Sequence, residues 1–302
     1  MTSAGRFAPS PSGELHVGNL RTAILAWLFA RSTGRDFLLR VEDLDRARAG
    51  AEEVQLRDLE AVGVTWDGAV VRQTDRAGLY DDAIQRLTDA GLTYECFCTR
   101  REIQEAPSAP HAPQGAYPGT CRNLSTAELE IRRSSRPAAI RLRSETHEWT
   151  VADELHGPYT GIVDDFVLRR NDGVTAYNLA VVVDDAEQGV DQVVRGDDLL
   201  SSTPRQAYLA SLLGLPVPEY AHVPLVLNHD GARLAKRDGA VTLGDLAAVG
   251  LSAPAVRDVI LESLGLPAGP LDDALDTFDP AGLPRGPWVW NGHQQTTLRK
   301  GA

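Results

Sequence analysis

Histidine, serine and glycine residues gather near the amino terminus, in the stretch Arg6-Phe-Ala-Pro-Ser10-Pro-Ser-Gly13-Glu-Leu-His16-Val-Gly18-Asn19. Such a stretch is typical of a strand end, a turn and the start of a helix. The unpaired N–H groups of a helix start, together with the helix dipole, bind anions such as phosphate. His16 adds a side-chain donor, and Gly18 lets a flat ring or a phosphate approach the backbone. The alternative is an ordinary turn with a surface histidine.

Three cysteines, Cys96, Cys98 and Cys121, form a second group. An odd number of cysteines does not make a disulfide framework. In a strand, Cys96 and Cys98 would point to opposite faces, but in a turn they can converge on a metal. Three thiolates and one further donor would close a tetrahedral structural zinc site. From chemistry alone His111 is the obvious fourth ligand, because phenolate ligands are rare. The alternative is three buried cysteines that act as small hydrophobic residues.

Charged residues follow two expected strands and occupy one loop. Glu42 ends the apolar run Asp36–Glu42, and Arg195 follows the run 189–194. Ligands of parallel sheets bind outside the carboxyl ends of the strands, which favours a ligand near Glu42. A solvated turn and a surface ion pair are the alternatives. Lys236 lies in the glycine-flanked loop 231–241, where a mobile ammonium suits a phosphate chain whose charge shifts during reaction.

The elements that must position these residues alternate between strands and helices. Helical spacing of apolar residues predicts helices at Leu20–Ser32, Glu52–Val62, Asp75–Ala90 and Ala253–Leu264. Short strands are expected at Asp36–Glu42, Gly63–Trp66, within Ala138–Trp149 and at 189–194. Thr203 is expected to cap a helix that begins with Pro204. The run Tyr177–Asp185 is compatible with a helix or a strand. This alternation predicts an α/β fold with a largely parallel sheet.

Composition sets further bounds. The chain has 302 residues, 43% of them hydrophobic, which suffices for one sizeable core and a smaller appendage. The longest apolar run, Ala23–Ala30, is much shorter than the ~20 residues of a membrane span, and no secretory leader is visible. We therefore expect a cytoplasmic protein without a membrane partner, and nothing indicates an obligate protein partner. The net charge of −12 argues against nonspecific electrostatic binding of nucleic acid by the whole surface, but it does not exclude a local basic face.

Two motifs resemble the signatures of class I aminoacyl-tRNA synthetases. Pro9–Gly18 is similar to the first signature in its glutamyl and glutaminyl form, Pro-Ser-Pro-Thr-Gly-x-Leu-His-Ile-Gly-His, with Asn19 in place of the last histidine. The loop 231–241 resembles the second signature, Lys-Leu-Ser-Lys-Arg-Asp-Gly. There Arg233 and Ala235 replace the first lysine and the serine, and Lys236 is retained. The blocks around Tyr177 and Arg195 also resemble those of glutamyl enzymes.

The cysteine pattern resembles that of a narrower family. Cys-x-Cys followed by Tyr-x-x-x-Cys is similar to the short glutamyl-tRNA synthetase paralogues called glutamyl-Q tRNA(Asp) synthetases. The resemblance implies one structural zinc ion per chain, held by Cys96, Cys98, Tyr117 and Cys121, with His111 as the alternative to Tyr117.

The resemblance also implies an architecture. We expect a class I synthetase domain of the Rossmann type over residues 1–240, interrupted at about 93–150 by a small zinc-binding insert. A short helical extension is expected over residues 241–302, without an anticodon-binding domain.

Site roles follow from the same resemblance. His16 and Lys236 are expected to be catalytic, and His16, Gly18, Asn19 and Lys236 to bind ATP together with magnesium. Glutamate is expected to contact five residues: Arg6, Ser10, Glu42, Tyr177 and Arg195.

The implied reaction is activation of L-glutamate with ATP, without tRNA, to glutamyl-adenylate. Transfer to queuosine at the wobble position of tRNA(Asp) would follow. The nearest alternative is the catalytic fragment of an ordinary glutamyl-tRNA synthetase, which charges the 3′ end of tRNA(Glu). An adenylate-forming ligase that uses no RNA and an inactive zinc-stabilised RNA-binding paralogue are further alternatives. The retained His16, Glu42 and Lys236 argue against the last one.

Overall fold

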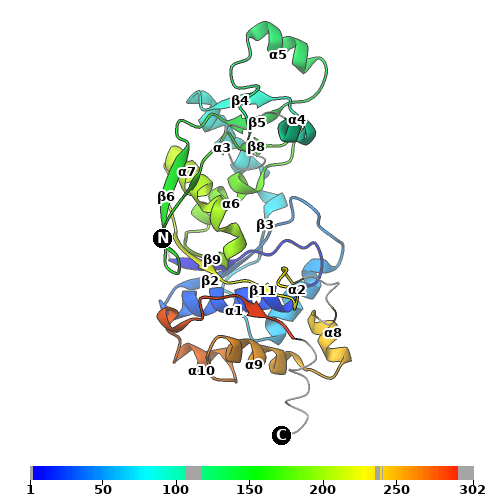
Figure 1. The fold of residues 1–302 in the computed structure, drawn as a ribbon, viewed down its shortest axis with the longest axis vertical. Helices are drawn as coiled ribbons and strands as arrows, with labels where there is room; N and C mark the ends of the chain where they lie inside the picture. Colours follow the sequence, from blue (N-terminus) through cyan, green and yellow to red (C-terminus); the bar gives the residue numbers. More distant parts are fainter. Residues whose placement is uncertain (1–2, 106–116, 235–238, 240, 292–302) are drawn as a thin grey trace.

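A seven-stranded sheet crosses the middle of the molecule in the order β3-β2-β1-β9-β10-β6-β7 (Figure 1). The computed structural model describes residues 3–105, 117–234, 239 and 241–291. All neighbouring strands are parallel except β6 and β7. The strands are β1 (Ala4–Phe7), β2 (Asp36–Val41), β3 (Val71–Arg72), β6 (Glu148–Asp153), β7 (Gly157–Ile162), β9 (Val190–Gly196) and β10 (Glu219–Val223). The expected α/β fold with a mostly parallel sheet is confirmed.

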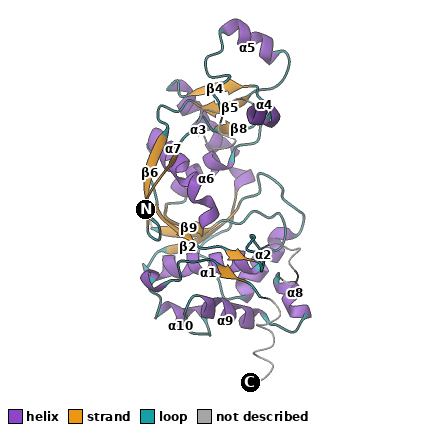
Figure 2. Cartoon of the chain, viewed as in Figure 1, coloured by secondary structure: helices purple, strands orange, loops and turns teal. Residues whose placement is uncertain are grey.

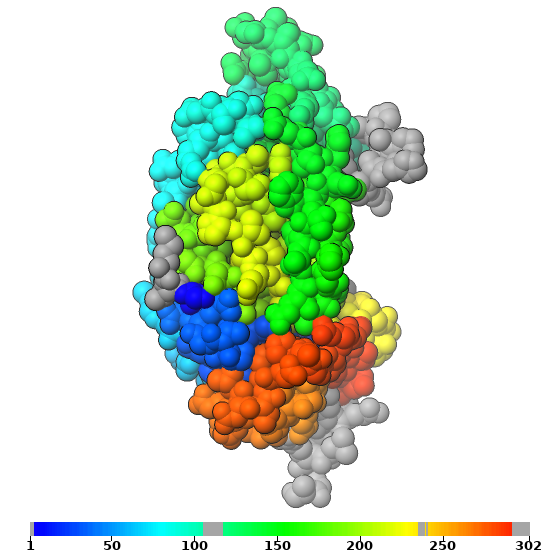
Figure 3. Space-filling model, turned by 90° about the vertical axis from the view of Figure 1, so that its left-hand side faces the viewer, coloured from blue at the N-terminus to red at the C-terminus, as the bar shows by residue number. Residues whose placement is uncertain are grey.

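Helix α1 (Val17–Ser32) packs beneath the sheet and is buried on almost all sides. It begins at Val17 rather than Leu20, because His16 caps it. Helices α9 (Ala253–Ser263) and α10 (Leu271–Leu275) cover the side of α1 that faces away from the sheet. Figure 3 shows these carboxyl-terminal helices in orange against the blue amino-terminal segment. Phe29 of α1 meets Phe278 edge to face, with ring centroids 5.2 Å apart.

Three helices form a second core on the opposite face of the sheet. They are α3 (Ala77–Asp89), α6 (Tyr177–Glu187) and α7 (Thr203–Leu213). Their inward residues, among them Leu87, Leu179 and Leu209, are buried together. The run Tyr177–Asp185, whose sequence is compatible with a helix or a strand, is therefore a helix, and its valines face this core.

The remaining elements connect the core to its edges. Helix α2 (Ala51–Ala61) follows β2, and α8 (Leu243–Ala248) begins at a capping box of Thr242 and Asp245. Strands β11 (Val226–Leu227) and β12 (Trp288–Val289) form a small parallel pair. Short 3-10 helices span Gln73–Arg76, Asp197–Ser202 and Pro280–Gly282. Among the described residues, no helix combines the length and apolar character that a membrane crossing requires.

A small antiparallel sheet lies at the end of the molecule opposite α9 and α10 (Figures 1 and 2). It consists of β4 (Thr93–Cys96), β5 (Ala139–Leu142) and β8 (Val167–Arg169). Helices α4 (Arg100–Glu105) and α5 (Thr126–Arg133) project from it. We call the region 93–143 the knob. Its own small core contains Cys96, Phe97, Tyr117 and Cys121.

Several local expectations are wrong. Gly63–Trp66 forms no strand, and the edge strand is β3, because the chain turns at Gly63 and packs Trp66 on the lower core before it reaches the sheet. The short strand expected within 138–149 is present as β5, but a second strand, β6, begins at Glu148 and was not expected. Ser202, not Thr203, occupies the N-cap of α7, because a 3-10 helix leads directly into it. Beyond residue 241, α8 and α10 accompany the one expected helix.

Candidate active site and metal centre

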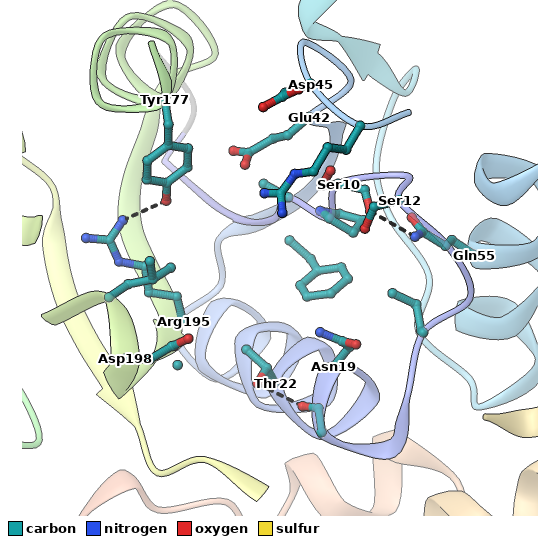
Figure 4. A pocket seen from close by; sticks show the side chains of 18 of the residues that line it. Ser10, Ser12, Asn19, Thr22, Glu42, Asp45, Gln55, Tyr177, Arg195 and Asp198 are labelled. Atoms are coloured by element: carbon teal, nitrogen blue, oxygen red, sulfur yellow. Dashed lines mark hydrogen bonds between the residues drawn. The ribbon is translucent and has the colours of Figure 1, made fainter. Parts of the chain in front are cut away.

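A cavity of about 670 Å³ opens where β1, β2 and β9 end. Its size falls within the range of small-molecule sites. Strand β1 lies between β2 and β9, so the chain order reverses at this point, as at the ligand sites of open α/β sheets. In Figure 4, Tyr177 and Arg195 lie on the left of the cavity and Glu42 at its top. Ser10 lies on the right, while Asn19 and Thr22 of α1 form the floor.

The start of α1 faces this cavity through a capping box. The His16 Nδ1 accepts from the Asn19 backbone N–H at 3.3 Å, and the Asn19 Oδ1 accepts from the His16 N–H at 3.2 Å. Asparagine therefore suits this position as a cap. A Cβ on Gly18 would lie 2.9 Å from the His16 ring and 3.3 Å from Val226. The glycine is thus required by the His16 ring and Val226, in addition to any ligand.

Lys236 and Ala235 lie outside the described residues, but the described flanks of their loop meet the first motif. Leu234 donates from its backbone N–H to Val226, and the Val241 carbonyl accepts from the Val17 N–H at 2.9 Å. His16 and Thr242 form an isolated antiparallel bridge. Arg233 lines the cavity and pairs with Asp198 at 2.6 Å. Both sequence motifs are therefore joined at the cavity.

Arg195 is a buried cation, 5% exposed, whose hydrogen-bond partners are neutral. Its Nη2 donates to Thr203 Oγ1 at 2.8 Å and to Gln206 Oε1 at 2.7 Å. Its Nη1 lies 3.4 Å from the hydroxyl of Tyr177, as the dashed line in Figure 4 marks. Within the described chain, the structure pairs no carboxylate with Arg195. A buried cation in this state favours an anionic ligand.

Arg6 is held differently. Its Nε and Nη2 donate to the two carboxylate oxygens of Asp185 at 3.2 and 3.4 Å. Asp185 also pairs with Arg40 at 2.8 Å. The pKa of Asp185 is lowered, because the nearby charges of Arg6 and Arg40 outweigh its burial. Arg6 reaches the cavity, but its charge is already compensated.

Glu42 lies at the other end of this buried ionic network. Arg40 Nη2 is 3.4 Å from its carboxylate, and the Glu42 backbone N–H donates to the Pro9 carbonyl. Burial raises the pKa of Glu42 despite the neighbouring charge of Arg40. A cationic group of a ligand would favour its charged form.

Ser10 lies in the turn before α1, and Gln55 of α2 holds that turn. The amide nitrogen of Gln55 donates to the carbonyls of Ser10 at 3.0 Å and Gly13 at 2.6 Å. Gln55 is 2% exposed, so the turn is fixed from inside the protein.

The structure thus brings Arg6, Ser10, His16, Gly18, Asn19, Glu42, Tyr177 and Arg195 to one cavity. Sequence reasoning missed the residues behind them, namely Arg40, Gln55, Asp153, Asp184, Asp185, Thr203, Gln206 and His222. The adjacent Asp184 and Asp185 were a visible signal, since such a pair within an apolar run requires buried partners.

The three cysteine sulfurs converge in the knob, all within 4.8 Å of one another. The strand ends at Cys96, so the following turn brings Cys98 to the same side. The sulfurs of Cys98 and Cys121 are 3.6 Å apart. Tetrahedral zinc with Zn–S bonds of about 2.3 Å separates its sulfurs by about 3.8 Å. The donor set and the spacing therefore fit zinc.

The Tyr117 hydroxyl lies beside the cysteine sulfurs. Its oxygen lies 3.3 Å from Cys96 Sγ and 3.8 Å from Cys98 Sγ, and it accepts from the Cys121 N–H at 2.8 Å. The Arg141 guanidinium lies 3.7 Å from the centre of the Tyr117 ring. Although burial opposes it, contact with Tyr117 and the charge of Arg141 lower the pKa of Cys96. Burial and the charge of Cys96 raise the pKa of Cys98 to about 12. His111 lies outside the described residues.

Comparison with known proteins gives a consistent result. The family model described as "tRNA synthetases class I (E and Q), catalytic domain" matches residues 4–261. A relative from Nocardia farcinica is 68% identical over 287 residues, covering 95% of this chain and 92% of the relative. A relative from Symbiobacterium thermophilum is 46% identical and covers 94% of each chain. Both relatives are named glutamyl-Q tRNA(Asp) synthetase.

Solved structures with the same fold are also similar. A glutamate tRNA ligase from Elizabethkingia meningosepticum in complex with its amino acid aligns with a TM-score of 0.83 at 26% identity. The alignment covers 98% of this chain and 68% of that one. A glutamate-tRNA synthetase from Elizabethkingia anophelis aligns with a TM-score of 0.84 at the same identity.

Proposed function

We propose a function from one premise: the chain belongs to the glutamyl-Q tRNA(Asp) synthetase family, within the glutamyl and glutaminyl class I tRNA synthetases. The enzyme activates glutamate with ATP to glutamyl-adenylate and transfers glutamate to queuosine of tRNA(Asp). In the first step, an α-carboxylate oxygen of glutamate bonds to the α-phosphorus, while the bond from that phosphorus to pyrophosphate breaks. In the second step, a queuosine hydroxyl takes the glutamyl group, and AMP leaves.

Activation needs positioning and charge stabilisation rather than a covalent enzyme intermediate. The amino-terminal end of α1, with His16 and Asn19, would hold the phosphates of ATP. Lys236 would stabilise the departing pyrophosphate. Magnesium bound with ATP supplies further positive charge to the phosphates. The bridge between His16 and Thr242 supports this arrangement, because it joins the end of the Lys236 loop to α1.

Glutamate would be held from two sides of the cavity. Glu42 would pair with its α-ammonium group, and this pairing would favour the charged form, which burial disfavours. Arg195 and the Tyr177 hydroxyl would bind the side-chain carboxylate. Ser10 and Arg6 would complete the wall. Selectivity against glutamine would rest on Arg195, because a neutral amide would leave its buried charge without an anion.

The knob would hold one structural zinc ion through Cys96, Cys98, Cys121 and Tyr117. Its position away from the cavity argues for a structural rather than a catalytic ion. Residues 93–143 contain eight arginines against five glutamates, a balance of +3 in a chain of net charge −12. This local positive charge makes the knob a suitable contact for the RNA backbone.

The buried Arg195, facing the cavity with neutral partners only, is the observation that carries the choice of glutamate. The acceptor follows from the family, whose relatives match over nearly their whole length. These relatives favour queuosine of tRNA(Asp) over the 3′ end of tRNA(Glu).

Two assays test the proposal. In the first, glutamate-dependent exchange of pyrophosphate into ATP is measured without tRNA, and we expect exchange with glutamate but not with glutamine. In the second, radiolabelled glutamate is supplied with tRNA(Asp) that carries queuosine, with tRNA(Asp) that carries guanosine there, or with tRNA(Glu). We expect label only on the first, mapped by nuclease digestion to the wobble nucleotide. Label on the 3′ end of tRNA(Glu) would support the ordinary synthetase instead.

A further inference from the structure

A buried chain of three polar side chains leads from the outer part of the sheet to the cavity. Asp153 Oδ2 lies 2.6 Å from His222 Nδ1, and His222 Nε2 lies 3.0 Å from Arg195 Nε. Strands β6, β10 and β9 contribute one residue each. The side chains of His222 and Asp153 are fully buried, and neither residue lines the cavity.

The hydrogen bonds fix the protonation of this chain. The Arg195 Nε–H can only donate, so His222 Nε2 must accept. The ring proton of His222 therefore lies on Nδ1 and is donated to Asp153. Asp153 also accepts from the backbone N–H groups of Leu155 and His156 at 3.0 Å each. With donors on every side, Asp153 is an ionised acceptor and His222 is neutral.

The same bonds account for four of the five N–H groups of Arg195. His222 takes Nε–H, Thr203 and Gln206 take the two on Nη2, and Tyr177 faces one on Nη1. The remaining Nη1–H has no partner among the described residues. A rotated guanidinium would lose the His222 bond and turn Nη1 away from the Tyr177 hydroxyl.

We infer that His222 and Asp153 form a positioning relay that orients the Arg195 guanidinium and thereby sets the affinity and selectivity for the glutamate side chain. The inference rests on the proposed activation of glutamate. Neither residue touches the substrate, so both are positioning residues. The relay acts through the tautomer of His222, which Asp153 selects.

Asp153→Asn would break the relay while changing the shape of the side chain very little. In the unaltered protein, both carboxylate oxygens of Asp153 face hydrogen-bond donors. In the asparagine, one of these oxygens is replaced by an NH2 group, which is itself a donor. If the amide NH2 faces His222, the ring must move its proton to Nε2, where it opposes the Arg195 Nε–H. If the NH2 faces Leu155 and His156 instead, it opposes their N–H groups. Either arrangement disturbs the relay.

The first experiment measures KM for glutamate and for ATP in pyrophosphate exchange without tRNA. We expect Asp153→Asn to raise KM for glutamate on the order of tenfold to a hundredfold and to reduce the preference over glutamine. KM for ATP should change by no more than about twofold. Asp191→Asn is the matched control, because Asp191 pairs with Arg35 away from the cavity.

A second pair of variants replaces His222. The amide oxygen of His222→Gln can still accept from Arg195, whereas His222→Phe keeps the ring that stacks on Tyr220 but accepts nothing. We expect the Gln variant to retain more glutamate affinity than the Phe variant. If Asp153→Asn fails to fold, this pair of variants tests the relay: equal glutamate affinity of the Gln and Phe variants would contradict it.

Nitrogen-15 NMR of histidine-labelled protein supplies a readout that does not depend on activity. The His222 signal, assigned from its loss in His222→Gln, should show protonated Nδ1 and unprotonated Nε2. A proton on Nε2 in the unaltered protein would overturn the relay, as would equal increases of both KM values in Asp153→Asn. If the unaltered protein shows no glutamate-dependent exchange, the proposed function and the inferred link to glutamate fail together. The tautomer would then still report whether His222 orients Arg195.

Discussion

The glutamate side of the cavity and the cysteine cluster are held together in opposite ways. Arg195 is fixed by hydrogen bonds to residues of three other elements, β10, α6 and α7. The cysteine cluster comes from one stretch of chain, and Cys98 and Cys121 mainly face each other's sulfur. The fold itself therefore builds the first site before any ligand binds. The second site brings like groups together, and the zinc ion that we propose there would hold them.

The largest expected effect is on the preorganised site. Arg195→Ala should raise KM for glutamate by about thirtyfold or more, because removing a buried charged partner costs roughly 2–5 kcal/mol. KM for ATP should change little, since Arg195 lies on a different wall of the cavity from α1, which would bind ATP (Figure 4). Pyrophosphate exchange measures both constants. Arg35→Ala, which removes surface pairs with Asp191 and Glu219, is the control. Equal weakening of both substrates would contradict the role of Arg195.

A substitution in the cysteine cluster should have the opposite effect: the knob should lose structure, while the cavity still binds ATP. Purified protein should contain about one zinc ion per chain, and Cys121→Ser should lose it and destabilise the knob. ATP binding, measured by calorimetry, should persist. Metal analysis by mass spectrometry checks the zinc content. Zinc-free protein from a preparation without chelator would exclude the site.

A smaller effect concerns pH. Burial raises the pKa of Glu42, so its carboxylate becomes protonated at a higher pH than an ordinary glutamate. Protonated Glu42 cannot pair with the α-ammonium of the substrate, so KM for glutamate should rise as pH falls through this raised pKa. It should be constant above it. Glu42→Gln should have a high KM with no such inflection. An inflection unchanged in this variant would assign the titration to another group.

The smallest expected effect distinguishes the two possible fourth ligands of the cluster. Tyr117→Phe should weaken zinc binding, on the order of tenfold to a hundredfold, because the three thiolates remain. His111→Ala should leave zinc affinity unchanged. Competition with a chromogenic chelator measures both affinities. The reverse result would identify His111 as the ligand.

Local patterns predicted the parts of the molecule that depend on nearby residues. The helix after His16 and the convergence of the cysteines both involve residues close in sequence, although the cap at His16 was missed. The edge strand β3 and helices α8 and α10 were missed, because they are two to six residues long and carry too few residues for a periodic pattern.

The layer behind the cavity could not be predicted for a different reason. Asp153 and His222 are 69 residues apart, and Arg6 and Asp185 are 179 apart. No spacing rule connects such positions, since the strand order of the sheet decides which of them meet. Thr203 illustrates the limit: its type suggested a helix cap, but its hydroxyl accepts from Arg195.

The burial of α1 has a consequence for how the protein is made. This helix is among the first segments to leave the ribosome, yet α9 and α10, which cover its outer side, are among the last described segments to follow. Arg21 of α1 donates to Ser263 at the end of α9 and to the Pro224 carbonyl. Until those partners emerge, the apolar surface of α1 can be covered only by the early strands or by a chaperone. A nascent chain arrested before residue 253 should therefore be prone to aggregation.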